Sequence, residues 1–470
     1  MTYTTVPLNL AGPTDQVFSK QQDHQLTQNY YVYLSEAGPA LQGTPGTTLY
    51  SATVTDGKDR GWHVFNSELY TVSGSLLERV AEGGTRTTIG TVPGTGRCIF
   101  DDDGVSMFLT TSGKVYRYER VFSTFIEIVG GGHERPNSVT YLNDQFIYDG
   151  FDNRFGVSDV GNGAVIESFN YATAESNPDN TSRVYSFGER LYVMCLTSIE
   201  TWWNSGDGEP PFQKIDLGLV EKGLGSIYSV SNTDSFMYFF GDDLNIYQLK
   251  GSQVNNISNA GITKEINAFN GTNDAIGFCF NLQGQDFYYI TFPSGDKSYL
   301  YAENTGLWTS MAFGVDGGRH LATSYAYVYG KHLVSDRRNG RVLEWDLDIN
   351  QDNGAVIQRR RVLPNISGEL LGKPGDRLMM KGIDFTMQKG VGIPSGQGED
   401  PIIMVEISLD GSETWNPIQN LRFGRGGEFA KKVRADKMAS FYDASVRLTT
   451  SDPVFSSLRS AGIDIQLAGW

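Results

Sequence analysis

One short pattern returns seven times between residues 69 and 333 of this sequence: an apolar or aromatic run with turn-forming residues ahead of it. The clearest copy runs from Leu191 to Leu196, after the turn pair Gly188-Glu189. As a strand it would carry apolar side chains on both faces. Such a strand must be covered on both sides. The chain therefore has to build sheets that stack face against face.

The copies are regularly spaced. Their marker residues are Leu69, Phe108, Phe146, Leu191, Met237, Phe287 and Leu333. The steps between markers are 39, 38, 45, 46, 50 and 46 residues, with a mean of 44. Strand-rich repeats of roughly 40 to 50 residues predict a β-propeller with one four-stranded blade per repeat. The blade count stays open between six and seven. A solenoid of β-rolls is the alternative, although its coils usually run shorter, at roughly 20 to 30 residues.

The strand that follows the central copy carries a tryptophan pair. Ile199 to Trp203 predicts the returning strand of a hairpin, closed by the polar loop Asn204 to Gly208. Neighbouring residues of a strand point to opposite faces. One of Trp202 and Trp203 is therefore expected to pack inside the blade, and the other is a candidate for subunit contact.

The repeat is lost near a polar connector, Asn350 to Gly354. We predict a propeller over residues 1–355, including an N-terminal strand region, and a C-terminal β-sandwich over residues 356–470. The strand candidates of the second domain are Met379 to Met387, Ile402 to Leu409, Ala444 to Leu448 and Gly462 to Leu467. The fold class predicted is all-β.

Composition limits the functions that the chain can have. No apolar run reaches the roughly 20 residues needed to cross a bilayer, and the first residues contain no signal-peptide pattern. We therefore expect the chain to be made and folded in the cytoplasm. It has 38 basic and 54 acidic residues, for a net charge of −16. This balance disfavours wrapping of nucleic acid, which needs clustered Lys and Arg.

The sequence contains no recognisable catalytic, cofactor or metal motif. The five histidines form no ligand or triad pattern, and we expect each to be a surface or turn residue: His24, His63, His133, His320 and His332. The three cysteines, Cys98, Cys195 and Cys279, are far apart among apolar neighbours, which indicates core residues and no zinc site. We predict that the chain is not an enzyme.

Ser408 to Trp415 approaches the Asp-box SxDxGxTW of sialidase-type propellers, with Ser412 in place of its glycine. In such a box the aspartate fixes a β-turn and the tryptophan packs beneath the hairpin. The role is structural, and only one copy is present. It motivates one alternative, a carbohydrate-binding or carbohydrate-active propeller.

The run Arg359-Arg360-Arg361 is a second candidate contact site. It could meet DNA or an acidic partner. Alternate residues of a strand point opposite ways, however, and a solvated or ion-paired strand at a domain junction is the favoured interpretation. The candidate interface residues are therefore Trp202, Trp203, Arg359, Arg360 and Arg361.

Several short segments together resemble the packaged-DNA stabilisation, or tail hub, proteins of short-tailed bacteriophages. They are the turn Gly43-Thr44-Pro45-Gly46, Gly188 to Val193 leading into Ser198 to Trp203, Glu221 to Leu224, and Asp352-Asn353-Gly354 before the arginine run. The resemblance covers most of the chain and depends on the order and length of diffuse motifs.

This resemblance implies a tail accessory factor, present as a hexameric ring below the portal and its adaptor. The ring would close the DNA exit channel and offer attachment sites for tailspikes, fibres or a needle. It implies no cofactor and no catalytic residue, and a place in the virion tail after assembly in the host. Packaged DNA would be passing cargo, and we expect an acidic channel wall that lets a duplex slide. A cytoplasmic scaffold propeller unrelated to a virus is a further alternative.

Overall fold

The computed structural model of the chain describes residues 3–16, 24–36, 38–53, 57–177 and 179–468. Nearly all of its regular structure is β-strand, which confirms the predicted all-β class. Within these ranges the one α-helix is α2 (Ala260–Asn267), and η1 (Gly368–Leu371) is a short 3₁₀ helix. No helix in these ranges is long and apolar enough to span a membrane.

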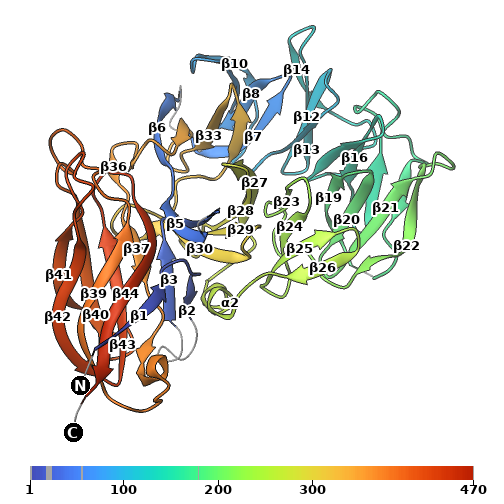
Figure 1. Cartoon of the computed structure of the whole chain (residues 1–470). Helices are drawn as coiled ribbons and strands as arrows, with labels where there is room; N and C mark the ends of the chain where they lie inside the picture. The colour runs from blue at the N-terminus through green and yellow to red at the C-terminus, as the bar shows by residue number, and fades with distance from the viewer. Residues whose placement is uncertain (1–2, 17–23, 37, 54–56, 178, 469–470) are drawn as a thin grey trace.

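Seven units of four antiparallel strands form a ring, as Figure 1 shows; five are separate sheets and two are parts of larger sheets. We call them blades 1 to 7 in chain order. The strands of blades 1 to 3 are β7 (Asp59–Phe65), β8 (Glu68–Ser73), β9 (Leu76–Val80), β10 (Arg86–Thr91), β11 (Ile99–Asp102), β12 (Ser106–Thr111), β13 (Lys114–Glu119), β14 (Thr124–Ile128), β15 (Val139–Leu142), β16 (Gln145–Asp149), β17 (Arg154–Val157) and β18 (Tyr171–Thr173). Those of blades 4 to 6 are β19 (Thr181–Phe187), β20 (Arg190–Cys195), β21 (Ile199–Asn204), β22 (Phe212–Val220), β23 (Ser231–Asn232), β24 (Met237–Phe240), β25 (Ile246–Lys250), β26 (Gln253–Asn256), β27 (Ile276–Leu282), β28 (Gln285–Phe292), β29 (Lys297–Ala302) and β30 (Leu307–Phe313).

Blade 7 closes the ring with a strand from the other end of the propeller. It consists of β32 (Tyr325–Val328), β33 (Lys331–Ser335) and β34 (Val342–Asp346), with β6 (Gly46–Ser51) as its outermost strand. The two segments are also joined by Trp345, whose Nε1 donates a hydrogen bond to the carbonyl oxygen of Pro45 at 2.9 Å. The blade count left open by the sequence is therefore seven for the described residues.

Each marker residue of the sequence repeat lies on the second strand of one blade. These strands are buried on both faces because a neighbouring blade covers each side; β20, for example, is buried from Leu191 to Cys195. Aromatic pairs fill the space between blades, as where Phe108 meets Phe146 at 4.4 Å between ring centroids. The predicted stacking of blades is confirmed.

The C-terminal region forms two sheets that face each other across one hydrophobic cluster. The cluster includes Ile383 and Ile463 from one sheet and Val405 and Val446 from the other. Its strands are β37 (Arg359–Val362), β38 (Ile366–Ser367), β39 (Leu378–Met387), β40 (Ile402–Ser408), β41 (Asn416–Arg422), β42 (Val433–Phe441), β43 (Asp443–Thr450) and β44 (Ser457–Leu467). The predicted strands thus exist, and their classification as a β-sandwich stays a prediction.

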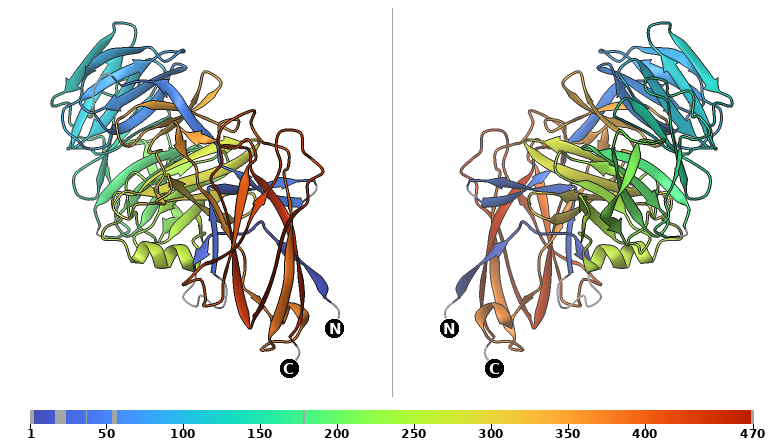
Figure 2. Two further views of the ribbon diagram at one scale, coloured as in Figure 1. Left: turned by 90° about the vertical axis from the view of Figure 1, so that its left-hand side faces the viewer. Right: turned by 90° about the vertical axis from the view of Figure 1, so that its right-hand side faces the viewer.

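The N-terminal strands pair with the C-terminal ones. β1 (Thr4–Asn9) and β5 (Gly38–Gly43) both pair with β44, and β4 (Tyr30–Ser35) pairs with β5. The views in Figure 2 accordingly place the two termini at the same end of the molecule, away from the propeller. The sheet pairing therefore crosses the predicted division at residue 355, and that division as a boundary between folding units stays a proposal.

One sheet runs through both parts of the molecule. β3 (His24–Gln28) pairs in parallel with β30 of blade 6 and antiparallel with β37. Short flanking strands complete the fold: β2 (Asp15–Gln16), β31 (Gly318–Arg319), β35 (Gln351–Asp352) and β36 (Ala355–Val356). The outer edge of blade 6 is thus covered by β3, which on its other side pairs with β37 of the C-terminal sheets.

Candidate functional site

The innermost strands of the blades surround a cavity on the propeller axis. Its volume is about 190 Å³, and its lining comes from β7, β11, β19, β27 and β32 together with the segment before β23. The aromatic side chains of Phe100, Phe278 and Tyr325 contribute to the wall. The charged lining residues are Arg97 and Arg183. The cavity is therefore partly aromatic and carries positive charge.

A second hollow of about 240 Å³ adjoins this cavity, and we call it the axial mouth. Its charged lining residues are Lys58, Asp59, Arg97, Asp274, Arg319 and Arg337. They lie in loops that lead into innermost strands, at the first residue of β7, in β31, or in the loop between the second and third strands of blade 7. Because the strands of a blade alternate in direction, these loops lie on one face of the propeller. The axial mouth opens on that face.

The structure separates the two predicted tryptophans. Trp202 is buried, its ring centroid lies 5.1 Å from that of Phe155, and its Nε1 donates a hydrogen bond to Glu200 at 3.0 Å. Trp203 is 45% exposed. It lines a surface hollow of about 540 Å³ with Asn143, Glu189, Arg190, Asn204 and Ile215. The expectation that one of the two packs in the blade is met by Trp202, and the interface role of Trp203 stays a prediction.

The structure does not show a solvated arginine strand. Arg359 and Arg361 are buried at the junction between the propeller and the C-terminal sheets. Arg359 donates hydrogen bonds to the carbonyl oxygen of Thr44 and to the side chain of Asn350, at 3.3 and 3.2 Å. The solvated interpretation is wrong for these two residues, because N-terminal and loop acceptors surround them. Buried in this way, neither offers a surface to DNA or to a partner.

Arg361 is held by the N-terminal segment. Its Nη2 donates to Oε1 of Gln25 at 2.6 Å, and its Nη1 donates to Oγ1 of Thr27 at 3.0 Å. Gly12 leaves room for the guanidinium, since a Cβ there would lie 2.4 Å from Nη2. Arg360 points to the other side of the strand and is half-buried. An interface role therefore stays a prediction for Arg360.

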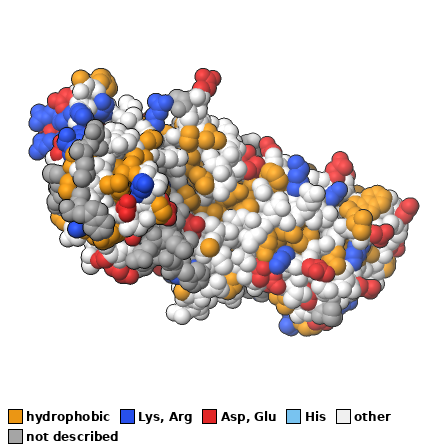
Figure 3. All heavy atoms as spheres, turned by 60° about the horizontal axis from the view of Figure 1, so that its bottom comes forward, with side chains coloured by type: hydrophobic (Ala, Val, Ile, Leu, Met, Phe, Trp, Pro, Cys, Tyr) orange, Lys and Arg blue, Asp and Glu red, His pale blue; other side chains and the backbone are white. Residues whose placement is uncertain are grey.

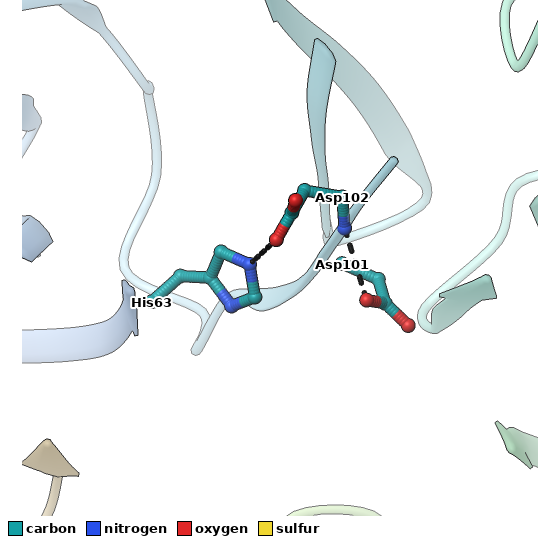
Figure 4. Close-up of side chains that lie close together, drawn as sticks. All are labelled: His63, Asp101 and Asp102. Atoms are coloured by element: carbon teal, nitrogen blue, oxygen red, sulfur yellow. Dashed lines mark hydrogen bonds and ion pairs between the residues drawn. The ribbon is translucent and has the colours of Figure 1, made fainter. Parts of the chain in front are cut away.

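His63, Asp101 and Asp102 are close enough to be considered as metal ligands, and Figure 4 shows them. His63 Nε2 lies 2.6 Å from Oδ2 of Asp102, which joins blade 1 to blade 2. The carboxylate of Asp101 points away from the histidine and accepts hydrogen bonds from the backbone N–H groups of Asp102 and Tyr141. Burial raises the pKa of Asp101. The arrangement is better explained as a link between blades 1, 2 and 3 than as a cation site.

Two groups of potentially reactive side chains are held in the core. Cys98 and Cys195 are buried, and burial raises the pKa of their thiols to about 11 and about 12, so they stay protonated. Cys279 is partly buried. The surface or turn position predicted for the histidines is wrong for His320, which is buried beside Tyr289 and Trp345. Burial lowers the pKa of His320 to about 4, so the ring is neutral.

The Asp-box segment acts as a turn. The Asp410 carboxylate accepts hydrogen bonds from the backbone N–H groups of Glu413 and Thr414 and from the hydroxyl of Ser408. The guanidinium carbon of Arg447 lies 4.4 Å from the ring centroid of Trp415. The carboxylate is thus occupied by the turn, which gives the carbohydrate alternative no support.

A sequence profile of the family described as "Bacteriophage P22 Gp10, beta-propeller" matches residues 31–350. The match covers more than half of the 470 residues. The chain belongs to this family. Membership in the P22 Gp10 family confirms the resemblance noted in the sequence and makes the chain a bacteriophage structural protein. All seven blades lie inside the matched range, and β37 to β44 lie outside it.

No curated protein is similar enough in sequence to count as a relative. Similar solved structures include the computationally designed Ika8 protein, with TM-score 0.40, 9% identity, and coverage of 72% of this chain and 99% of that one. The WD40 domain of Neurospora crassa Pan2 has TM-score 0.43, 10% identity, and coverage of 65% and 95%. The WD40 β-propeller domain of Doa1 has TM-score 0.42, 12% identity, and coverage of 64% and 96%. Nothing about function follows from such remote likeness.

Charged side chains are distributed unevenly over the surface. In Figure 3, basic side chains gather at the end of the molecule that the C-terminal sheets occupy. Basic residues of these sheets are paired with carboxylates, as where Arg422 lies 2.7 Å from Asp400 and Lys432 lies 3.1 Å from Asp384. Paired surface charges of this kind add little free energy of binding or folding. The axial mouth differs because its lining contains more basic than acidic side chains.

Sequence reasoning did not single out the residues of the axial mouth. Lys58, Arg97 and Asp274 each stand within three residues of the start of an innermost strand, so they recur with the blade repeat. An alignment of the repeats on their innermost strands would place these residues at equivalent positions. The marker residues lie on the second strands, so aligning on the markers does not reveal them.

Proposed function

We propose that the chain is a tail hub, or tail accessory factor, of a short-tailed bacteriophage. In this role it forms a ring, with six copies expected, below the portal and its adaptor. The ring closes the DNA exit channel, retains the packaged genome, and gives tailspikes, fibres or a needle their attachment sites. The observation that carries the proposal is the family match over residues 31–350, which includes every blade.

Hydrogen bonds between the side chains of neighbouring blades support a structural and non-enzymatic role. Several polar side chains that are at least partly buried connect one blade to the next. Thr140 donates to Ser186 at 2.8 Å between blades 3 and 4, and Tyr185 donates to Asn232 at 2.6 Å between blades 4 and 5. Satisfied buried networks of this kind rigidify a fold. A rigid ring suits a component that has to transmit force and hold other proteins.

One face of the propeller presents apolar side chains that suit protein contacts. The loops that join first to second strands and third to fourth strands lie on the face opposite the axial mouth. In blades 2 and 3 these loops expose Val105, Val121, Phe122, Val160 and Phe169, and Phe122 is 70% exposed. Exposed apolar groups on one face mark interaction sites. We assign this face, together with Trp203 of blade 4, to contacts with a neighbouring copy or another virion protein.

The net charge of −16 suits a protein that DNA passes without binding. Phosphate neutralisation would slow ejection, whereas an acidic wall repels the backbone. The wall in question belongs to the assembled ring and is distinct from the axial cavity of one propeller. In the virion, packaged DNA is cargo and the protein partners are the adaptor and the tail attachments.

The proposal is tested with phage particles made without this protein. Such particles are expected to package DNA and then lose it, and addition of the purified full chain should restore retention and infectivity. Particles assembled without the portal adaptor serve as the control, because the chain should not attach to them. Retention of DNA and full infectivity in particles that lack the chain would refute the proposed role.

A further inference from the structure

The axial mouth concentrates positive charge in a strongly acidic protein. Four cationic residues line it, Lys58, Arg97, Arg319 and Arg337, against the two carboxylates of Asp59 and Asp274. They come from segments of the chain that are far apart in sequence and that the ring closure brings together. The whole chain has a net charge of −16, so acidic residues outnumber basic ones overall. An excess of basic residues in this hollow is therefore opposite to the overall charge.

The two carboxylates of the axial mouth are already engaged. Asp59 accepts hydrogen bonds from the hydroxyls of Thr323 and Ser324, at 2.9 and 2.7 Å, and lies 3.4 Å from Arg97. Asp274 accepts from the backbone N–H and the hydroxyl of Ser294, at 2.8 and 2.6 Å. Neither is within ion-pair distance of Arg319 or Arg337.

Arg319 and Arg337 lie next to each other, and a nearby carboxylate, Asp296, accepts a hydrogen bond from the backbone N–H of Arg319 at 3.2 Å. Nη2 of Arg337 is 3.4 Å from the carbonyl oxygen of Arg319, and neither guanidinium forms an ion pair in the described part of the chain. Each also has a shielded N–H group without an acceptor, at Nη1 of Arg319 and Nε of Arg337. Native proteins rarely leave buried donors unused, and a missing ion is one of the recognised reasons.

The size of the hollow limits what it can hold. Its volume of about 240 Å³ equals roughly eight waters at about 30 Å³ each. It shares Arg97, Tyr228, Ile276 and Thr323 with the deeper axial cavity, whose other charged lining residue is Arg183. The space fits a compact anion and is far too small for a duplex. The positive lining continues inward from the mouth.

We propose that the axial mouth is a binding site for a compact oxyanion, a phosphate group or a carboxylate cluster, held by Arg319 and Arg337. The planar guanidinium presents paired N–H donors that match two oxygens of such a group. The bound anion accepts from the unused donors and neutralises the two adjacent charges. The site is independent of the tail hub role, because it lies within one propeller.

Isothermal titration calorimetry of the full chain tests this site. Inorganic phosphate, pyrophosphate and citrate are titrated separately at constant ionic strength, with sodium chloride as the blank. We expect saturable binding of at least one oxyanion with one site per chain. Stronger binding of the phosphates would identify a phosphate site, and stronger binding of citrate a carboxylate site. No saturable heat with any of the three would overturn the proposal.

Variants locate the binding. Arg319→Gln and Arg337→Gln should each weaken the anion roughly ten- to a hundred-fold, because each removes a charge-assisted hydrogen-bond donor. Arg425→Gln is the matched control, since Arg425 is an exposed arginine of the C-terminal region. In the absence of anion both mouth variants should melt at or above the wild-type temperature, which shows that they fold. Unchanged binding in both mouth variants, or an equal loss in the control, would overturn the assignment.

Discussion

Arg359 donates a hydrogen bond from Nη2 to the carbonyl oxygen of Thr44, 315 residues earlier in the chain, at 3.3 Å. The contact joins β37, the first long strand after the propeller, to the turn that precedes the closing strand of blade 7. Gly43 allows this approach, since a Cβ at that position would lie 2.5 Å from Nε of Arg359. The junction between the two parts of the molecule is therefore built around buried arginines.

The neighbouring arginines should contribute unequally to stability. Arg361→Met removes the buried, charge-assisted hydrogen bonds to Gln25 and Thr27, so we expect a loss of about 2–4 kcal/mol in the free energy of unfolding. Arg360→Met on the same strand is the control and should cost less than about 1 kcal/mol. Urea denaturation of both variants provides the comparison, and equal losses would contradict the assigned roles.

The two tryptophans should separate stability from assembly. Trp202→Ala opens a cavity between blades and should cost about 3–5 kcal/mol. Trp203→Ala, at a 45% exposed position, should change the free energy of unfolding by less than about 0.5 kcal/mol and should weaken self-association. Thermal denaturation and light scattering report the two effects. Normal self-association of the Trp203 variant would remove it from the interface.

The close approach at Gly43 makes a sharp prediction about side-chain volume. Gly43→Ala forces a methyl group against the buried guanidinium of Arg359 and should destabilise the chain by about 1–3 kcal/mol. At Gly271 the nearest atoms to an added Cβ are 3.7 Å away, so Gly271→Ala should stay within about 0.5 kcal/mol of wild type. A Gly43→Ala variant as stable as wild type would show that the Arg359 side chain can move aside at little cost in free energy.

Asp352 gives the junction a pH dependence. Burial raises the pKa of its carboxyl group from 3.8 to about 7, against the opposing effect of Arg359. The folded state then holds a proton that the unfolded state releases, so this contribution to stability is complete below pH 4 and is lost as the pH rises to about 7. Relative to Asp352→Asn, the wild type should lose about 2–4 kcal/mol between pH 4 and pH 7.5.

Urea unfolding of both proteins across that range measures the difference. Asp348→Asn, at an exposed position close by in sequence, corrects for the removal of one carboxylate from the surface. Identical pH profiles for the wild type and Asp352→Asn would mean that Asp352 is ionised in the fold at neutral pH.

The propeller could be predicted because its second strands are buried on both faces. Strands covered on both faces are apolar at nearly every position, as in Leu191 to Cys195. All seven marker residues fall on these strands. The innermost strands are less completely buried than the second strands, as in β7 and β11, so they give a weaker signal.

The partners of the terminal strands could not be predicted. β1 has an alternating pattern that any half-buried strand would have, and nothing in it specifies pairing with Ile465 or Asp464 at the other end of the chain. The burial of Arg359 and Arg361 depends on the same long-range pairing, because most of their acceptors come from residues 13 to 44 and one comes from Asn350. The local sequence pattern predicts that a strand forms. Contacts with distant parts of the chain determine which of its side chains are buried.

Electron cryomicroscopy of the phage that encodes this chain measures the central claim directly. We expect six copies of the seven-bladed propeller in a ring below the portal and adaptor, with the apolar loops of blades 2 and 3 and Trp203 covered by a neighbouring protein and with DNA ending above the closed channel. A particle that lacks the chain, or that carries it as single copies away from the exit channel, would contradict the tail hub role.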